Sequence, residues 1–311
     1  MRAFLIFVLI GISLHTAFAQ KNLYYRAVSF RHDNDINFFS DKYYTSGIEI
    51  KWYSPVLHHS PINNILLPGD TASLVAYAIT ITHHIYTPED IFTADIVPND
   101  HPYSSYVLFG EMKEQYNPEK HRKMTSSFQI GVIGPVVGGE IIQNSLHDRI
   151  TIADPVKGWH NQIQNDLCLQ YMAQYEQGLI NGKFVGLYSN LQMELGIPQT
   201  QAITGLKTRL GLFSPFYSGP ETYQSNAWYL YGFTEANLHV VNYNAVLQGG
   251  LFNKNNHHVL YNMNHTFWDF RYGGTFVYKN FSATYGVEIN SPIFTTALWH
   301  RWSEVTFVLA F

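Results

Sequence analysis

Charged residues are scarce in this sequence. Asp, Glu, Lys and Arg together make up 14% of its 311 residues, whereas a typical soluble domain has about 25%. The formal net charge is only −4, and no basic patch stands out. The scarcity of charge argues against an ordinary soluble domain, and the missing basic patch argues against a nucleic-acid partner.

Cysteine and long apolar segments are also nearly absent. Cys168 is the only cysteine, so an intrachain disulfide is excluded. Beyond the N-terminus, no segment reaches the roughly 18 consecutive apolar residues that a membrane-spanning helix needs. The remaining chain is therefore either soluble or crosses a membrane with strands.

The N-terminus has the features of an export signal. Arg2 supplies a positive charge, residues 3–14 are almost wholly apolar, and Ala17-Phe18-Ala19 is a small-residue cleavage pattern. A membrane anchor would need a longer apolar run. We therefore expect a signal peptide at residues 1–19 and one mature domain at residues 20–311.

Aromatic residues are abundant, with 22 Tyr, 21 Phe and 6 Trp. Many aromatic side chains with few charges are typical of a wall that faces lipid and carries aromatic girdles at both membrane interfaces. The sequence also contains runs of about ten residues with alternating polarity. Clear examples lie at residues 44–52, 166–176 and 185–195.

The first of these runs and the strand-like segment at the end of the chain illustrate the pattern. Tyr44, Ser46, Ile48, Ile50 and Trp52 are expected on one face, with Thr45, Gly47, Glu49 and Lys51 on the other. The final run places Val305, Phe307, Leu309 and the terminal Phe311 on one face, which resembles the C-terminal signal of bacterial outer-membrane proteins. The sequence therefore predicts an all-β protein: a transmembrane antiparallel β-barrel of about twelve strands, located in the outer membrane, with short helical segments in its loops.

Three polar clusters interrupt the alternating runs, at residues 33–47, 85–90 and 131–166. Alternate connections of an antiparallel barrel lie at the same end. If residues 23–33 run outward, all three clusters therefore fall at the extracellular rim. The connection at residues 54–72 would be periplasmic although it is long, and we expect a short helix there.

The first cluster offers oxygen ligands for a hard cation. Its candidate ligands are Asp33, Asn34, Asp35 and Thr45. Carboxylate, amide and hydroxyl oxygens suit Ca²⁺ or Mg²⁺. The spacing is not that of an EF-hand, and the same residue types are typical of an Asx-rich turn. Both interpretations stay open on spacing alone.

The third cluster offers a general base. His160 follows Gly158-Trp159, and an imidazole titrates near neutral pH. Asp166 is expected at the top of a strand on its lumenal face, where it could orient the imidazole as the carboxylate of a hydrolase triad does. It could equally be an ordinary lumenal carboxylate. We interpret His147, in the same cluster, as structural.

Taken together, several blocks resemble the outer-membrane lipid A 3-O-deacylase family. The blocks are Asp33-Asn34-Asp35, Tyr44-Thr45-Ser46-Gly47, Ile85-Tyr86-Thr87-Pro88, the stretch with Gly134-Pro135, Gly139-Glu140, Gln143 and His147, and Gly158-Trp159-His160-Asn161-Gln162. They follow in order through the N-terminal half, whereas the C-terminal half matches only as generic barrel strands. The resemblance implies a twelve-stranded barrel that removes the 3′-acyloxyacyl group of lipid A in a Ca²⁺-dependent reaction at the outer leaflet.

The resemblance also implies roles for individual residues. Asn34, Asp35 and Thr45 match site residues near the cation and the oxyanion, and His160 matches the general base. Asp166 falls where the family has a glutamate, which keeps the charge but shortens the side chain. The implied mechanism has His160, oriented by Asp166, deprotonate a water, while a cation held near Asp35 stabilises the oxyanion.

Two alternatives to this function remain open from the sequence. One is a non-enzymatic barrel, either a small pore or a structural protein, because about twelve strands lie between filled barrels and wide porins. The other is an outer-membrane phospholipase, since both substrates present ester bonds in a membrane. The expected partners are lipid A or lipopolysaccharide and the surrounding outer-membrane lipid, and we expect a monomer.

Overall fold

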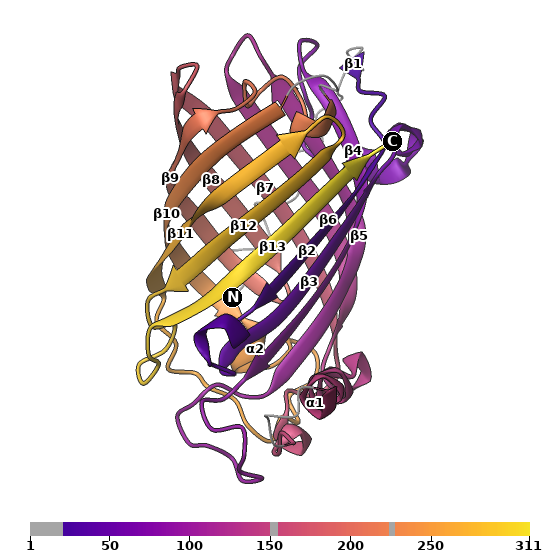
Figure 1. Ribbon diagram of the computed structural model, residues 1–311. Coiled ribbons are helices and arrows are strands. Elements are labelled where there is room, and N and C mark those ends of the chain that lie inside the picture. Colours follow the sequence, from indigo (N-terminus) through magenta and orange to yellow (C-terminus); the bar gives the residue numbers. More distant parts are fainter. Residues whose placement is uncertain (1–20, 150–154, 224–227) are drawn as a thin grey trace.

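The computed structural model describes residues 21–149, 155–223 and 228–311. Strands β2 to β13 form a closed antiparallel barrel, because β4 pairs with β5 as well as with β3 (Figure 1). The prediction of a barrel of about twelve strands is confirmed. The predicted signal peptide at residues 1–19 lies outside the described residues.

The wall strands have the following bounds: β2 (Ala27–Asn34), β3 (Tyr43–Tyr53), β4 (Leu74–Thr87), β5 (Ser104–Asn117), β6 (Arg122–Ile133), β7 (Asp166–Asn181), β8 (Val185–Gly196), β9 (Gln199–Leu212), β10 (Trp228–Asn244), β11 (Thr266–Tyr278), β12 (Phe281–Asn290) and β13 (His300–Ala310). A further short strand, β1 (Lys21–Asn22), pairs in parallel with β4. None of the helices in the described ranges is long and apolar enough to cross a membrane.

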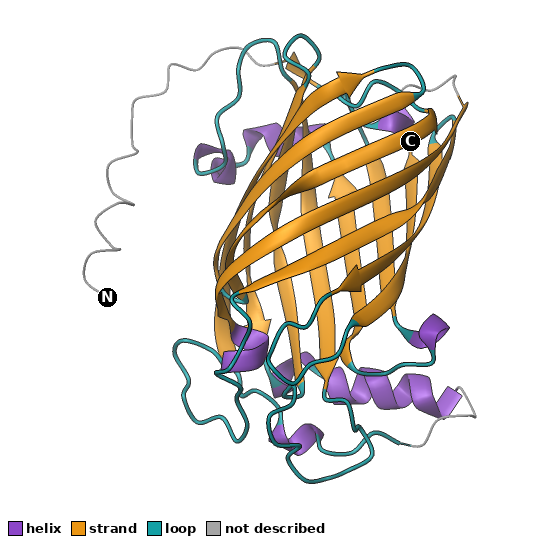
Figure 2. Ribbon diagram, turned by 90° about the vertical axis from the view of Figure 1, so that its left-hand side faces the viewer, coloured by secondary structure: helices purple, strands orange, loops and turns teal. Residues whose placement is uncertain are grey.

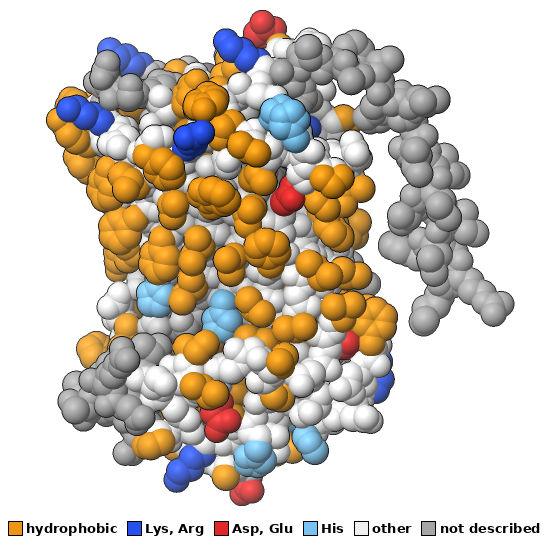
Figure 3. Space-filling view, turned by 90° about the vertical axis from the view of Figure 1, so that its right-hand side faces the viewer, with side chains coloured by type: hydrophobic (Ala, Val, Ile, Leu, Met, Phe, Trp, Pro, Cys, Tyr) orange, Lys and Arg blue, Asp and Glu red, His pale blue; other side chains and the backbone are white. Residues whose placement is uncertain are grey.

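The wall strands bury one face and expose the other. In β7, Leu167 and Leu169 are exposed, whereas Asp166, Cys168 and Gln170 are buried. On the face drawn in Figure 3, exposed apolar side chains gather in a broad band across the wall. This alternation is the one expected for a wall between lipid and a polar lumen.

The helices divide between the two ends of the barrel (Figures 1 and 2). One end carries η1 (Ile36–Phe38), η4 (Pro135–Val137), α1 (Gly139–Arg149), η5 (Trp159–Asn161) and α2 (Ala245–Gln248); we call it the α1 end. Near the opposite end lie η2 (Pro55–His59), η3 (Pro61–Asn64) and η6 (Glu221–Tyr223). The helical structure expected at residues 54–72 is thus present as η2 and η3, and the three polar clusters meet at the α1 end as predicted.

An apolar plug packs across the α1 end of the barrel. It comprises Tyr43, Tyr86, Tyr106, Leu108, Ile133, Ile163, Cys168, Ile197, Val241, Ala245, Val246, Leu247, Leu260, Met263, Phe294 and Ala297. Its members come from α2, from loops, from strands β3 to β7 and from β10, so both sides of the wall contribute to it. Such a plug is unlike the water-filled lumen of a porin.

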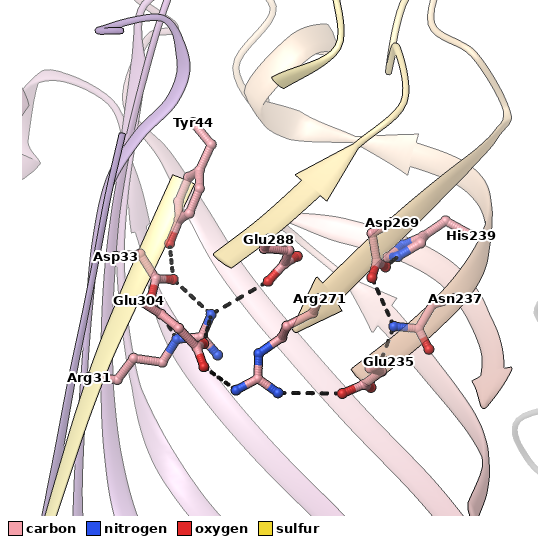
Figure 4. A network of polar contacts seen from close by, with 10 residues as sticks. All are labelled: Arg31, Asp33, Tyr44, Glu235, Asn237, His239, Asp269, Arg271, Glu288 and Glu304. Carbon is pink, nitrogen blue, oxygen red and sulfur yellow. Dashed lines mark hydrogen bonds and ion pairs between the residues drawn. The ribbon is translucent and has the colours of Figure 1, made fainter. Parts of the chain in front are cut away.

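Farther from the α1 end than the plug, an ion network lines the lumen (Figure 4). The guanidinium of Arg31 lies 2.7 Å from the carboxylate of Asp33 and 3.0 Å from that of Glu304. Arg271 pairs with Glu304 and also lies 3.4 Å from Glu235. The network therefore links β2, β13, β11 and β10 through charges that each find an opposite partner.

The network predicts the effect of removing one cation. Arg31→Met should destabilise the barrel by about 3–5 kcal/mol, because it takes a partner from the fully buried Glu304 and leaves charge uncompensated. The temperature at which the folded, detergent-resistant band disappears on an unheated gel measures this change. Adding Glu304→Gln should recover part of the loss, and Lys183→Met, in an exposed turn, should change little. Equal shifts for Arg31→Met and Lys183→Met would contradict the network's role.

Candidate active site

A cavity of about 740 Å³ lies at the α1 end, between the barrel wall and α1. Its polar lining comprises Asn34, Asp35, Ser40, Asp41, Lys42, Thr45, Ser46, Glu89, Gln143, His147, His300 and Arg301. Its apolar lining comprises Ile36, Phe38, Phe39, Ile85, Ile91, Phe92 and Trp299. These residues come from the ends of β2 and β4, from η1 and its loop, from β3, from the β4–β5 connection, from α1 and from the start of β13. Parts of the chain that are distant in sequence therefore meet here.

The cavity lies on the outer side of the wall. Asp33 points into the lumen, where it accepts hydrogen bonds from Arg31 and from the Tyr44 hydroxyl. The next residue, Asn34, points the other way and lines the cavity, as does its cross-strand partner Ser46. The site therefore opens toward lipid rather than toward the lumen, and Asp33 is not available to it as a ligand.

A β-bulge in β3 places Thr45 in the cavity. Tyr44 pairs with Tyr86 and Ser46 pairs with Ile85, so Thr45 is the extra residue between them. Tyr44 therefore faces the lumen while Ser46 faces the cavity. The prediction that Tyr44 and Ser46 share one face was wrong, because strict alternation ignores the bulge.

Three oxygen-bearing side chains converge beside the bulge. The Thr45 hydroxyl lies 3.2 Å from a carboxylate oxygen of Asp35 and also contacts a carboxylate oxygen of Asp41. The hydroxyl has a single proton, so it can donate to only one of the two carboxylates. Burial raises the pKa of Asp35 to about 8, and the charge of Asp41 adds to the rise. The cluster therefore holds two carboxylates close together, and a cation bound between them would reduce their repulsion.

Asp41 also binds two residues of α1. Its carboxylate lies 2.8 Å from Nε2 of His147 and accepts a hydrogen bond of 2.8 Å from the Gln143 amide. Gln143 and His147 are four residues apart, so they lie on one face of the helix. From the sequence we interpreted His147 as structural, although its spacing of four residues from Gln143 was a usable signal for a shared partner.

Trp159 fixes the side chain of Gln143 through a hydrogen bond. Its indole N–H donates a hydrogen bond of 2.9 Å to the Gln143 side-chain oxygen, and the ring is 1% exposed. Gly139 packs so closely on this ring that a Cβ there would lie 2.8 Å from it. The Gly158-Trp159-His160 block thus supports the site through its tryptophan.

His160 and Asp166 are placed elsewhere. His160 is exposed on η5 and does not line the cavity. The Asp166 carboxylate accepts hydrogen bonds from the backbone N–H groups of Leu167, Phe252 and Asn253. The predicted pairing of Asp166 with His160 was therefore wrong. The Asp166 side chain is on the buried face of β7 and anchors the β10–β11 loop, whereas the cavity is outside the wall.

Asn34 lies where the sequence analysis expected it. Its side-chain oxygen accepts a hydrogen bond of 2.7 Å from the Ile36 N–H at the start of η1. This bond fixes the orientation of the amide, so the amide nitrogen is the group left to act as a donor toward the cavity. The structure thus brings together Asn34, Asp35 and Thr45 and adds Asp41, Gln143 and His147.

Known proteins resemble this chain over nearly its whole length. A family model described as outer membrane protein LpxR matches residues 4–311. Among solved structures, LpxR from Salmonella typhimurium is similar with a TM-score of 0.72 at 19% identity, covering 92% of this chain and 100% of that chain. The beta domain of the Bordetella autotransporter Brka has a TM-score of 0.46 at 8% identity, covering 93% of this chain and 100% of that chain. No curated protein matches the sequence.

The contact between Trp159 and Gln143 predicts a modest loss on substitution. Trp159→Phe should keep most of the packing but remove the indole donor, so Gln143 should hold Asp41 less firmly. We expect the rate of ester hydrolysis with the predicted lipid substrate to fall about 5-fold, as the loss of one ordinary hydrogen bond implies. Trp268→Phe, at an exposed position on β11, is the matched control. An unchanged rate in the Trp159 variant would show that the contact is dispensable.

Proposed function

The chain belongs to the family of outer membrane protein LpxR, and we propose that its outer cavity hydrolyses the ester-linked 3′-acyloxyacyl chain of lipid A. Membership confirms the lipid A 3-O-deacylase family that the sequence blocks resemble, and with it an ester hydrolase of the outer membrane. The observation that carries the proposed site is the pairing of His147 with Asp41 beside an oxygen cluster, in a cavity that faces lipid.

The surroundings of the cavity suit a lipid ester. Phe38, Phe39, Phe92 and Trp299 line it, and all but Phe38 are more than half exposed. Apolar side chains in such positions can hold acyl chains next to the bilayer. The polar groups lie deeper, around Asp41. A lipid would therefore enter with its chains along the rim and its ester bond near His147.

His147 is the proposed general base. When Nε2 donates its hydrogen bond to Asp41, the carboxylate orients the imidazole as in a hydrolase triad, and the imidazole takes a proton from water. Gln143 holds the other oxygen of Asp41, so the carboxylate keeps one orientation. In this proposal Asp41 has the positioning role that the sequence analysis gave to Asp166, and His147 replaces His160.

Asn34 is the proposed oxyanion donor. The tetrahedral intermediate carries negative charge on the former carbonyl oxygen, and a fixed N–H donor stabilises that charge. The bond from Ile36 to Asn34 holds the amide before substrate arrives, so no reorganisation is needed during the reaction. This assignment keeps Asn34 as a catalytic residue, as the sequence analysis expected.

The oxygen cluster fits a bound Ca²⁺. Asp35, Asp41 and Thr45 bring hard oxygen ligands together. The charge of Asp41 adds to the raised pKa of Asp35, and a bound cation would relieve this repulsion between the two carboxylates. Among the described residues no set of three His, Cys, Asp or Glu converges on one point, so neutral oxygens and water would complete the shell. When bound, the cation would supply positive charge that stabilises the oxyanion.

The two alternative functions differ in what they require. A pore needs an open lumen, and the apolar plug lies across it at the α1 end. A phospholipase would use the same ester chemistry, so only the substrate distinguishes it. Fatty-acid release from purified lipid A and from a glycerophospholipid, compared by mass spectrometry, separates the two enzymes.

The proposed base predicts a clear contrast between two histidines. His147→Ala should lower the rate of lipid A deacylation by about 10²–10⁴-fold, the usual contribution of a general base. His160→Ala should stay close to the parent, because its side chain is outside the cavity. Lipid A acylation in cells with equal membrane levels of each variant measures both.

Folding controls accompany this contrast. Each variant should keep the heat-modifiable band of the folded barrel, because neither histidine belongs to the wall strands. If His160→Ala is the inactive variant and His147→Ala is active, the assignment of the base is wrong. Asp41→Asn should fall between the parent and His147→Ala.

The raised pKa of Asp35 predicts a pH dependence of cation binding. Below pH 8 the carboxyl holds a proton that Ca²⁺ must displace, so affinity should fall by about tenfold per pH unit and level off above pH 8. A raised pKa also means that the cation-free fold is less stable as pH rises from 3.8 toward 8. Calorimetric titration of the detergent-solubilised protein at pH 6 and pH 8 tests the first effect. Equal affinities would remove Asp35 from the ligand set, and Asp35→Asn should bind weakly at both pH values.

A further inference from the structure

Arg301 occupies an unusual position on the lipid-facing wall. It is the second residue of β13 and lines the outer cavity. The start of β13 lies at the α1 end (Figure 1). Its neighbour Trp302 lines the lumen, whereas Phe307 and Leu309, in the same alternating row as Arg301, are exposed to lipid. A cation on this face lies where the apolar wall gives way to the polar loops.

The guanidinium of Arg301 is held but not neutralised. It stacks over the ring of Phe38 with 4.5 Å between its central carbon and the ring centroid. It forms no ion pair with any carboxylate in the described part of the chain, in which thirteen such pairs occur. The stack restricts the side chain while leaving its N–H donors available.

The other cation of the cavity behaves differently. The ammonium of Lys42 lies 2.7 Å from the carboxylate of Glu89, which neutralises it. The cavity therefore contains one compensated cation and one uncompensated cation. The side chain of Arg301 is exposed, so an anionic group of a ligand in the cavity can reach its N–H donors and pair with them.

We propose that Arg301 binds a phosphate group of the lipid A substrate and so sets the preference of the enzyme for a phosphorylated glycolipid. This inference rests on the proposed function and adds a specificity residue to it. A planar guanidinium matches phosphate oxygens with two parallel hydrogen bonds, and stacking on Phe38 orients that plane in advance. Phe38 is the last residue of η1, and Asn34 and Asp35 directly precede this helix. Phosphate binding at Arg301 would therefore fix the position of the headgroup relative to the ester bond that reacts.

The test measures binding separately from turnover. In the His147→Ala background, the dissociation constants of bisphosphorylated lipid A and of chemically dephosphorylated lipid A with the same acyl chains are measured in non-ionic detergent micelles. The protein with Arg301 should bind the phosphorylated form roughly 10-fold more tightly. Arg301→Ala should bring the ratio of the two constants close to one, and Arg301→Lys should retain part of it.

Arg26→Ala is the matched control. Arg26 is also exposed and stacks on an aromatic ring, at 5.2 Å from Tyr24, but it lies before β2 at the opposite end. The control should keep the full preference. A parallel measurement of kcat and KM with His147 present should show that Arg301→Ala raises KM for the phosphorylated substrate.

Three results would overturn the proposal. The ratio could survive Arg301→Ala, or both lipids could lose affinity equally, which would indicate that Arg301 only supports η1. Added anionic phospholipid could abolish the preference at low mole fraction, which would make Arg301 an anchor to neighbouring lipids instead. Failure of the parent to deacylate lipid A, with the binding preference intact, would count against the proposed function and not against the phosphate site.

Discussion

The whole arrangement depends on the two-sidedness of a β-strand. Successive side chains of β2 point to opposite faces, so Asp33 joins the lumenal ion network while Asn34, one residue later, enters the outer cavity. A closed wall thereby keeps two sets of polar groups apart although their residues are adjacent in sequence. The lumenal set holds strands together, and the outer set is left for chemistry. The bulge at Thr45 breaks this alternation in β3, and it brings Thr45 and Ser46 into the outer cavity together.

The sequence predicted most of the fold for physical reasons. Alternating polarity, scarce charge and abundant aromatic residues all follow from a wall between lipid and a polar interior, so the barrel, its approximate strand number and the common end of the three polar clusters could be read directly. The bulge could not. An extra residue in one strand leaves no mark in a pattern of period two, and Tyr44 and Ser46 consequently seemed to share a face.

The site was predictable in part. Asn34, Asp35 and Thr45 were found because they are close in sequence and offer oxygen ligands. The histidine that pairs with Asp41 was missed because His147 and His160 both lie in the connection between β6 and β7. Only the packing of α1 against the wall decides which of them reaches Asp41. The block around Trp159 was important for a reason that spacing does not reveal, since its indole holds Gln143. Asp166 was misassigned because being on a strand's inner face, which the pattern gave correctly, excludes it from an outer cavity.

The outward opening of the cavity determines the space through which substrate travels. A lipid in the leaflet reaches the cavity by sliding along the membrane plane, so encounters occur in two dimensions and the relevant concentration is the number of lipids per unit area. Saturation then depends on the mole fraction of substrate in the leaflet and not on its amount per volume of medium. A released acyl chain is already in the bilayer, so it can depart sideways without crossing water.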